Sequence, residues 1–361
     1  MRIAFILPTF SRHPVGGYQM VYKYANALVS RGWHVDVYYL AERYVVTPLI
    51  WGDFKMVTKR VVERFNKNRL KLDWFELDPR VSEHFHQLGP ISESYDCIIA
   101  TAAETARFVV DQSPRQGQKY YFIQALEDWI QGGEKRVFST YTLPLHKIVV
   151  ANWLEKLIFK KTGQHSDVIP NSIDTTEFYP SHSLTNRKNQ VAILNHILPD
   201  KNTKFGVEVL KKVKEEIPDL EVLMFGVPQR PSDLPSYFHY FRAANVEQLR
   251  DQIYGRAKIY LMPAKKEGWG LTGMEAMACG AALVATESNG IKEYGKNGTN
   301  ALLLPVDDEA AFVDSIIKLF KDENKRLDLV SAGLHDIKNF SLEKSTNELM
   351  TILQKTKRDL S

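Results

Sequence analysis

The sequence has little that departs from ordinary globular composition, and what it lacks excludes several classes of protein. Its two cysteines, Cys97 and Cys279, are too few for a disulfide framework, and each lies among apolar or small residues that suit a buried thiol. No uninterrupted apolar run approaches the roughly 18 residues that span a bilayer. With 47 Lys and Arg against 43 Asp and Glu, the net charge of +4 gives no reason to expect a nucleic-acid partner.

The N-terminal residues also lack the features of a secretory signal. The apolar run that begins at Met1 reaches Pro8 too soon, and no small-residue cleavage site follows it. At 44% hydrophobic and 25% charged residues, the composition is that of a folded, soluble chain, and 361 residues at ~150 per domain predict two domains. We therefore expect a two-domain cytoplasmic protein.

Short apolar runs alternate with stretches of helical spacing through both halves of the chain. We expect strands at 2–8, 35–40, 97–100, 120–124, 147–151, 167–170, 191–194, 220–225, 259–262 and 282–286. We expect helices at 18–30, 153–161, 205–216, 246–257, 271–279, 309–321 and 341–359. This alternation predicts α/β domains whose parallel sheets are covered on both faces, and ligands of such sheets bind beyond the carboxyl ends of the strands.

A polar stretch at 175–189 is the best candidate for a linker between the two domains. The predicted domains are 1–176 and 177–340. Residues 341–361 would form a closing helix, for which a return to the N-terminal domain is one option.

The segment from Lys265 to Gly280 carries the strongest chemical signal. It follows an expected strand, turns through glycines and enters a helix, whose first N–H groups form an anion site. Glu267 and Glu275 would lie ~12 Å apart if the segment were fully helical, which exceeds the ~5–10 Å of glycosidase pairs. The spacing better suits two carboxylates that bind hydroxyls at the two ends of a ligand with an anionic middle, such as a nucleotide-diphosphate sugar. From spacing alone, two solvated glutamates remain an alternative.

This segment resembles the C-terminal signature of the retaining GT-B glycosyltransferases, specifically their family 4-like group. Other elements follow in that family's order: a glycine loop at Gly16-Gly17, a Pro-Asn-Gly-(Ile/Val)-Asp-like element at 169–174 with serine in place of glycine, and a phosphate-binding lysine at Lys201. The likeness extends from residue 1 to about 350. It implies a GT-B architecture, in which two doubly wound, Rossmann-like domains face one another across an interdomain cleft.

The resemblance also implies a role for each matching residue. Glu267 would accept hydrogen bonds from the donor sugar, Glu275 would accept them from both ribose hydroxyls, and Lys201 would neutralise the leaving group. The remaining donor-binding positions would act through backbone groups or by closing over the donor phosphate or the acceptor: Gly16, Gly17, Val246, Gly270, Leu271 and Thr272.

The sequence departs from the family pattern at two further places. Asn195-His196 stands where the family has Gly-Arg, so His196 replaces a cation on the diphosphate and is predicted as a weaker catalytic substitute. Gln124 follows the strand after which relatives often carry a histidine, and we expect Gln124, Glu127 and Asp128 on the acceptor side. For Glu127 and Asp128, ordinary loop charges are the alternative.

No cofactor or metal is expected. The chain contains no Asp-x-Asp for a metal-held diphosphate, no zinc-spaced His or Cys cluster, and no G-x-G-x-x-G after the first strand. A lysine together with a helix N-terminus would serve the diphosphate instead.

The resulting hypothesis is a retaining hexosyltransferase that uses a nucleotide-diphosphate sugar as co-substrate. It would act on a glycan or lipid-linked acceptor hydroxyl in polysaccharide or glycoconjugate synthesis. The alternatives are a nucleotide-sugar epimerase of the same architecture, or a weakly active or non-catalytic partner of another glycosyltransferase.

One segment suggests where in the cell the protein acts. Residues 59–71 place six basic residues among apolar ones, a pattern that can bind an anionic membrane surface, with a solvated helix face as the alternative. The expected location is therefore the cytoplasm, with peripheral contact at the inner face of the membrane as an option.

Overall fold

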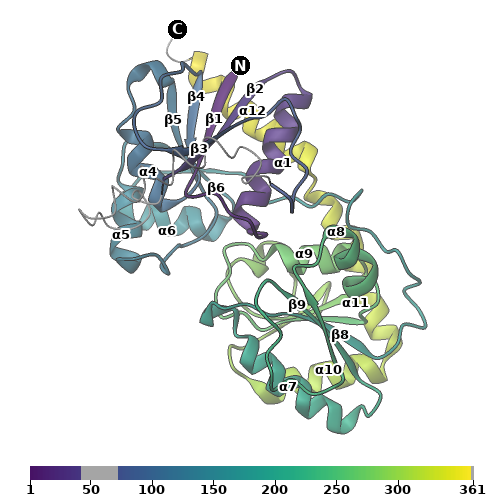
Figure 1. Ribbon diagram of the computed structural model, residues 1–361. Helices are drawn as coiled ribbons and strands as arrows, with labels where there is room; N and C mark the ends of the chain where they lie inside the picture. The colour runs from purple at the N-terminus through teal and green to yellow at the C-terminus, as the bar shows by residue number, and fades with distance from the viewer. Residues whose placement is uncertain (42–71, 359–361) are drawn as a thin grey trace. The chain divides into compact units, whose positions relative to one another are not determined.

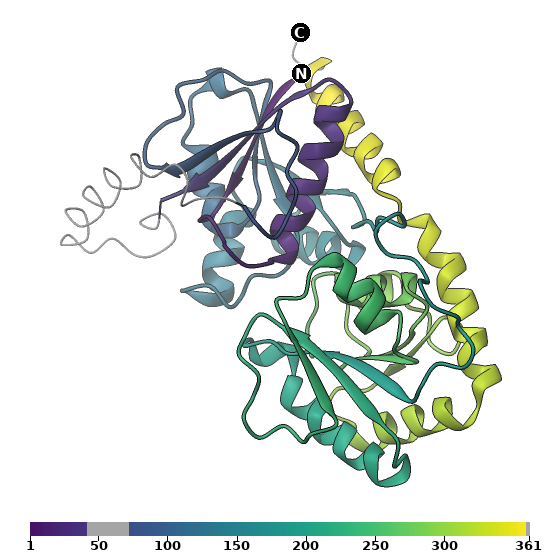
Figure 2. The ribbon, with the colours of Figure 1, turned by 45° about the vertical axis from the view of Figure 1, so that its right-hand side comes forward.

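The computed structural model describes residues 1–41 and 72–358, so the basic stretch at 59–71 lies outside the described residues. The chain divides into two compact units. Unit 1 runs to Pro170 and takes up the chain again from Leu342, and unit 2 is Asn171–Ser341. This division falls slightly before the boundary expected at 176. The last helix, α12 (Leu342–Arg358), belongs to unit 1, where it packs beside α1 (Gly16–Ser30) in both ribbon views (Figures 1 and 2).

Unit 1 is built on a seven-stranded parallel sheet in the order β3-β2-β1-β4-β5-β6-β7. The strands are β1 (Arg2–Leu7), β2 (His34–Leu40), β3 (Ser82–Gln87), β4 (Cys97–Ala100), β5 (Gln118–Ile123), β6 (His146–Val149) and β7 (Asp167–Val168). Besides α1 and α12, the unit contains α4 (Ala103–Val110), η2 (Pro114–Gln116), α5 (Gly133–Tyr141) and α6 (Asn152–Thr162). The central strands are buried along nearly their whole length, as expected for a sheet covered on both faces.

Unit 2 repeats this arrangement with six parallel strands in the order β10-β9-β8-β11-β12-β13. They are β8 (Gln190–Leu194), β9 (Glu221–Gly226), β10 (Phe238–Arg242), β11 (Ile259–Met262), β12 (Ala282–Thr286) and β13 (Ala301–Leu304). The helical elements are η3 (Pro199–Lys201), α7 (Thr203–Glu216), α8 (Val246–Gln248), the π-helix η4 (Leu249–Tyr254), α9 (Leu271–Ala278), η5 (Ile291–Glu293), α10 (Glu309–Lys321), α11 (Glu323–Asp336) and η6 (Ile337–Asn339).

The strand orders confirm two doubly wound α/β units. In each unit the first three strands follow one another toward one edge of the sheet. The fourth strand then pairs with the first, and the later strands follow it toward the opposite edge. The direction reverses between β1 and β4 in unit 1 and between β8 and β11 in unit 2. In sheets of this kind, the loops that follow the two strands at the reversal form the binding crevice.

The sequence interpretation missed three strands and the helices α4, α5 and α11, and it simplified one helix. β3 and β10 are strands whose residues are mostly half-exposed, so neither gave a clear apolar run. β13 is a four-residue apolar run that the sequence interpretation overlooked. The helix expected over 246–257 is a three-residue α-helix followed by the π-helix η4. Among the described residues, no helix is long and apolar enough to cross a membrane.

Candidate functional site

Helix α9 begins with backbone amides that no side chain caps. Its N-cap, Gly270, has a φ of 93°, and a Cβ there would lie 2.5 Å from Ile291 Cδ1, so only glycine fits without a shift. Leu271 and Thr272 are partly exposed, whereas Gly273 and the residues after it are buried. The first amides of a helix have no intrahelical acceptor, so this end of α9 is suited to bind an anion.

Lys201 and Glu267 form an ion pair at the strand reversal of unit 2. Lys201 ends η3 after β8, and its Nζ lies 2.7 and 2.8 Å from the two carboxylate oxygens of Glu267. Glu267 lies in the loop between β11 and α9 and is only 9% exposed. The predicted cation and the predicted sugar-binding carboxylate therefore come together where the fold places a ligand.

Glu275 lies within α9 and is 6% exposed. The hydroxyl of Tyr254, the last residue of η4, donates a hydrogen bond of 3.1 Å to its Oε2. Because the helix begins only at Leu271, Glu267 precedes it, and the separation expected for a fully helical segment does not apply. Val246 opens α8 directly after the capping residue Asn245, so the chain that follows it leads through η4 to Tyr254.

His196 follows β8 and lies near Lys201. Its Nδ1 accepts a hydrogen bond of 3.0 Å from the backbone N–H of Leu198, which leaves Nε2 as the protonated nitrogen of the neutral ring. Burial and the Lys201 cation lower the pKa of His196 below its usual value. His196 therefore provides a neutral donor where the family pattern provides a cation.

In unit 1, two predicted residues meet at the carboxyl edge of the sheet. Gly16 and Gly17 are the first residues of α1, and Gln124 directly follows β5. The Nε2 of Gln124 donates a hydrogen bond of 3.1 Å to the Gly17 carbonyl, and a Cβ on Gly17 would lie 3.2 Å from that same nitrogen. Within the described residues, the buried Oε1 of Gln124 has no hydrogen-bond partner.

Glu127 lies in the loop after β5, next to Asp128. Its Oε2 accepts a hydrogen bond of 2.5 Å from the backbone N–H of Ala103, the first residue of α4. Burial, reinforced by the neighbouring Glu104 carboxylate, raises the pKa of Glu127 to about 7, although the Ala103 bond opposes this shift. The N-terminus of α4 therefore already holds a carboxyl group from the chain itself.

Sequence reasoning missed Tyr254 and the loop after β12. Nothing in the spacing of the sequence links Tyr254 to Glu275, because the link depends on the π-helix. In the same way, a Cβ on Gly290 would lie 2.7 Å from the Glu267 carbonyl, so this loop packs directly against the site. The nearby hydroxyls of Thr286 and Ser288 are buried and have no hydrogen-bond partner in the described part of the chain.

Comparison with known proteins shows what unit 2 is similar to. Residues 174–336, nearly all of unit 2, match the model of the family described as Glycosyl transferases group 1. Over these residues the chain is similar to the group 1 glycosyl transferases. The resemblance carried by Lys201 and by the Glu267–Glu275 segment is thereby confirmed.

The chain is also similar to two curated proteins and to one solved structure. The D-inositol 3-phosphate glycosyltransferase of Corynebacterium efficiens is 26% identical over 179 residues, which are 45% of this chain and 42% of the relative. The phosphatidyl-myo-inositol mannosyltransferase of Mycolicibacterium smegmatis is 21% identical over 234 residues, or 60% of each chain. The chain thus spans less than two thirds of the length of these curated relatives. Anabaena HepE in complex with UDP and glucose superposes with a TM-score of 0.74 at 14% identity, covering 98% of this chain and all of that one. The fold is therefore GT-B.

Proposed function

We propose that the protein is a retaining hexosyltransferase that moves a sugar from a nucleotide-diphosphate donor to a hydroxyl of a glycan or lipid-linked acceptor. The single observation that carries this proposal is the pairing of Lys201 with Glu267 at the strand reversal of unit 2. The same loop leads through Gly270 into the open amides of α9. A cation, an anion-binding helix end and a carboxylate in one place suit a diphosphate joined to a sugar.

Donor binding would exchange the partners of this ion pair. The Lys201 ammonium would turn from Glu267 to the diphosphate, which the amides of Leu271 and Thr272 would also bind. Glu267, released from the lysine, would accept hydrogen bonds from sugar hydroxyls. Departure of a nucleoside diphosphate concentrates negative charge on its terminal phosphate, and a fixed cation stabilises that charge most in the transition state.

For the reaction we propose front-face displacement. The bond between the anomeric carbon and the phosphate oxygen breaks, and the acceptor oxygen forms its bond to the same carbon on the same face. The acceptor proton passes to the departing phosphate oxygen, so no covalent intermediate on the protein is needed. This step retains the configuration of the anomeric carbon.

The acceptor would bind unit 1 along the carboxyl edge of its sheet. Gln124 has an unpartnered buried oxygen there and lies against Gly17, while Glu127 and Asp128 occupy the same loop. These groups suit the hydroxyls of a neutral polyol. The name of the mannosyltransferase relative includes a phospholipid acceptor, which supports a lipid-linked acceptor as one form of the proposal.

The test is a screen of donors followed by product analysis. UDP-, GDP-, ADP- and dTDP-sugars are first ranked by thermal shift, because a ligand at 100 times its dissociation constant stabilises by about 2.7 kcal/mol. The donor that binds is then incubated with glycan and lipid-linked acceptors, and the anomeric configuration of the product is read by NMR. A product of retained configuration supports the proposal. Inverted configuration, or free nucleotide and an epimerised sugar without any acceptor, contradicts it.

A second candidate is a catalytically weak partner of another glycosyltransferase, and His196 favours it. A neutral imidazole stabilises a leaving diphosphate less than a guanidinium does. This candidate predicts donor binding with little turnover by the chain alone and a clear increase when a partner enzyme is added.

A further inference from the structure

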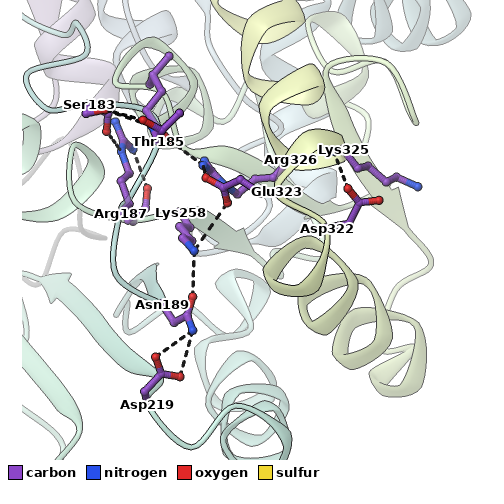
Figure 3. Close-up of polar contacts among 12 residues, drawn as sticks. Ser183, Thr185, Arg187, Asn189, Asp219, Lys258, Asp322, Glu323, Lys325 and Arg326 are labelled. Atoms are coloured by element: carbon purple, nitrogen blue, oxygen red, sulfur yellow. Dashed lines mark hydrogen bonds and ion pairs between the residues drawn. The ribbon is translucent and has the colours of Figure 1, made fainter.

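The segment at 175–189, expected to be a linker between the two domains, is bound to unit 2 through a buried arginine. Arg187 is 8% exposed, and its guanidinium bonds only to backbone carbonyls among its recorded partners. One of these is the carbonyl of Ser183 in the same segment, at 3.0 Å, and Figure 3 shows the two residues together.

The other carbonyls lie at or just after the C-terminal ends of η4 and α9, the two elements that carry the nucleoside end of the proposed donor site. Nη1 of Arg187 lies 2.7 Å from the Ala257 oxygen, 3.0 Å from that of Gly280 and 3.3 Å from that of Tyr254. Nη2 lies 3.0 Å from the Cys279 oxygen. The guanidinium thus joins the end of η4 to the C-terminal end of α9, where a cation also complements the helix dipole.

The same two elements are joined a second time by side chains. Tyr254, whose carbonyl Arg187 binds, donates its hydroxyl to Oε2 of Glu275. The backbone of Tyr254 and the C-terminal end of the helix that carries Glu275 are therefore both fixed by one side chain.

Gly280 allows the segment that contains Leu184 and Arg187 to pack closely against the end of α9. Its φ of +80° is a left-handed conformation, and a Cβ there would lie 2.3 Å from Leu184 Cδ2 and 3.2 Å from Nη2 of Arg187. A second buried arginine, Arg326, binds the same segment at the Leu184 carbonyl and pairs with Glu323 (Figure 3). None of its recorded hydrogen bonds reaches Tyr254 or α9.

We propose that Arg187 and Tyr254 are positioning residues for nucleoside recognition: Arg187 fixes the backbone of Tyr254 against the end of α9, and the Tyr254 hydroxyl holds the Glu275 carboxylate in the orientation that accepts both ribose hydroxyls. This inference rests on the proposed function, because it takes Glu275 as the ribose-binding group.

The test measures how well the protein distinguishes ribose from deoxyribose. UDP, GDP and ADP, their 2′-deoxy counterparts, and inorganic pyrophosphate are titrated calorimetrically into the full-length protein. In the wild type we expect the best ribonucleotide to bind about tenfold more tightly than its deoxy form. In Tyr254→Phe and Arg187→Met this ratio falls to about twofold, while pyrophosphate, which has no ribose, binds as in the wild type.

Two reference variants separate the possible failures. Glu275→Gln should lose the discrimination, and if it retains it, the proposed role of Glu275 is wrong and this inference falls with it. If Glu275→Gln loses the discrimination but Tyr254→Phe and Arg187→Met keep it, only the inference is overturned. Arg326→Met is the matched control, because it removes a buried arginine from the same segment. We expect it to lower the melting temperature and leave the ribose ratio unchanged. Equal loss of ribonucleotide and pyrophosphate binding in Arg187→Met would indicate a purely structural role and overturn its assignment.

Discussion

The carboxyl edges of the two sheets share one topology but differ in chemistry. In unit 2, the helix after the inner strand β11 opens with uncapped amides, and the charges beside it are balanced by the pairing of Lys201 with Glu267. In unit 1, the corresponding helix α4 follows β4, and its first amide is already occupied by the Glu127 carboxyl group. The comparison indicates that the same strand order leaves helix amides available to an anion only where the loops do not cap the helix end.

The difference matches the division that we propose, in which unit 2 binds the donor and unit 1 binds the acceptor. A nucleoside diphosphate needs cations and free amides, which the edge of unit 2 supplies. The edge of unit 1 instead carries Glu104, Glu127 and Asp128, and such a set of carboxyl groups disfavours an anionic ligand and suits hydroxyls. The following experiments would break or sharpen this contrast, beginning with the largest expected effect.

Removal of the Lys201 cation should have the largest effect. Lys201→Met leaves the leaving diphosphate without its fixed positive charge, and we expect kcat to fall by about 10²–10³-fold in donor turnover assays. The control is Lys265→Met, because Lys265 lies on the neighbouring loop and pairs with the exposed Asp307. Equal losses of kcat in the two variants would mean that the lysines at this edge act only through the overall positive charge and that Lys201 has no specific role.

Closing the glycine turn at Gly270 should have the next largest effect. In Gly270→Ala, the added methyl group would clash with Ile291, and alanine would be strained at the positive φ of this position. We therefore expect a loss of about 2–4 kcal/mol in unfolding free energy, together with weaker pyrophosphate binding. Gly298 also has a positive φ, of +73°, but open space around it. Gly298→Ala should therefore cost only about 1 kcal/mol and leave pyrophosphate binding intact, as measured by denaturation and calorimetry. Unchanged anion binding in Gly270→Ala would argue against the helix end as the site.

The buried carboxyl group of unit 1 should appear in the pH dependence of stability. Because burial raises the pKa of Glu127 from 4.5 to about 7, the folded chain holds more protons than the unfolded chain between these values, and stability falls as the pH rises through this range. Glu127→Gln cannot ionise but can still accept from Ala103. We expect the unfolding free energy of this variant to exceed that of the wild type by on the order of 1–2 kcal/mol at pH 8 and to equal it near pH 4. Denaturant titrations at several pH values measure this, and parallel profiles for the two proteins would contradict the assignment.

Restoring the cation of the family pattern should give the smallest effect, and we expect this substitution to increase activity. His196→Arg adds a charge that the neutral imidazole lacks, so we expect kcat to rise by about three- to tenfold in steady-state assays. A decrease in kcat would show that His196 has a role of its own, which an arginine at this position does not perform.

The sequence predicted the fold well where the apolar pattern was strong. The strands at 97–100, 259–262 and 282–286 and the helix at 309–321 have the predicted bounds, because buried parallel strands and amphipathic helices leave a clear pattern. The strands β3 and β10 gave no such signal, because they are only partly buried and rich in polar and aromatic residues. The proximity of Lys201 to Glu267 depends on long-range strand order, and only the family resemblance suggested it.

The role of the 175–189 segment could not be predicted from composition. Polar residues and Pro180 are typical of a linker, yet a single arginine can bury itself when backbone carbonyls satisfy its N–H groups, as Arg187 does. Such carbonyls come from the ends of η4 and α9, which are distant in sequence. For the same reason, the contact between Tyr254 and Glu275 could not be predicted from the sequence.

The most direct test of the central claim is a crystal structure of the protein with its nucleotide-diphosphate sugar. The account predicts diphosphate density against the amides of Leu271 and Thr272, with Lys201 Nζ turned from Glu267 to a phosphate oxygen. Density for the diphosphate elsewhere, with the Lys201–Glu267 pair still closed, would contradict it.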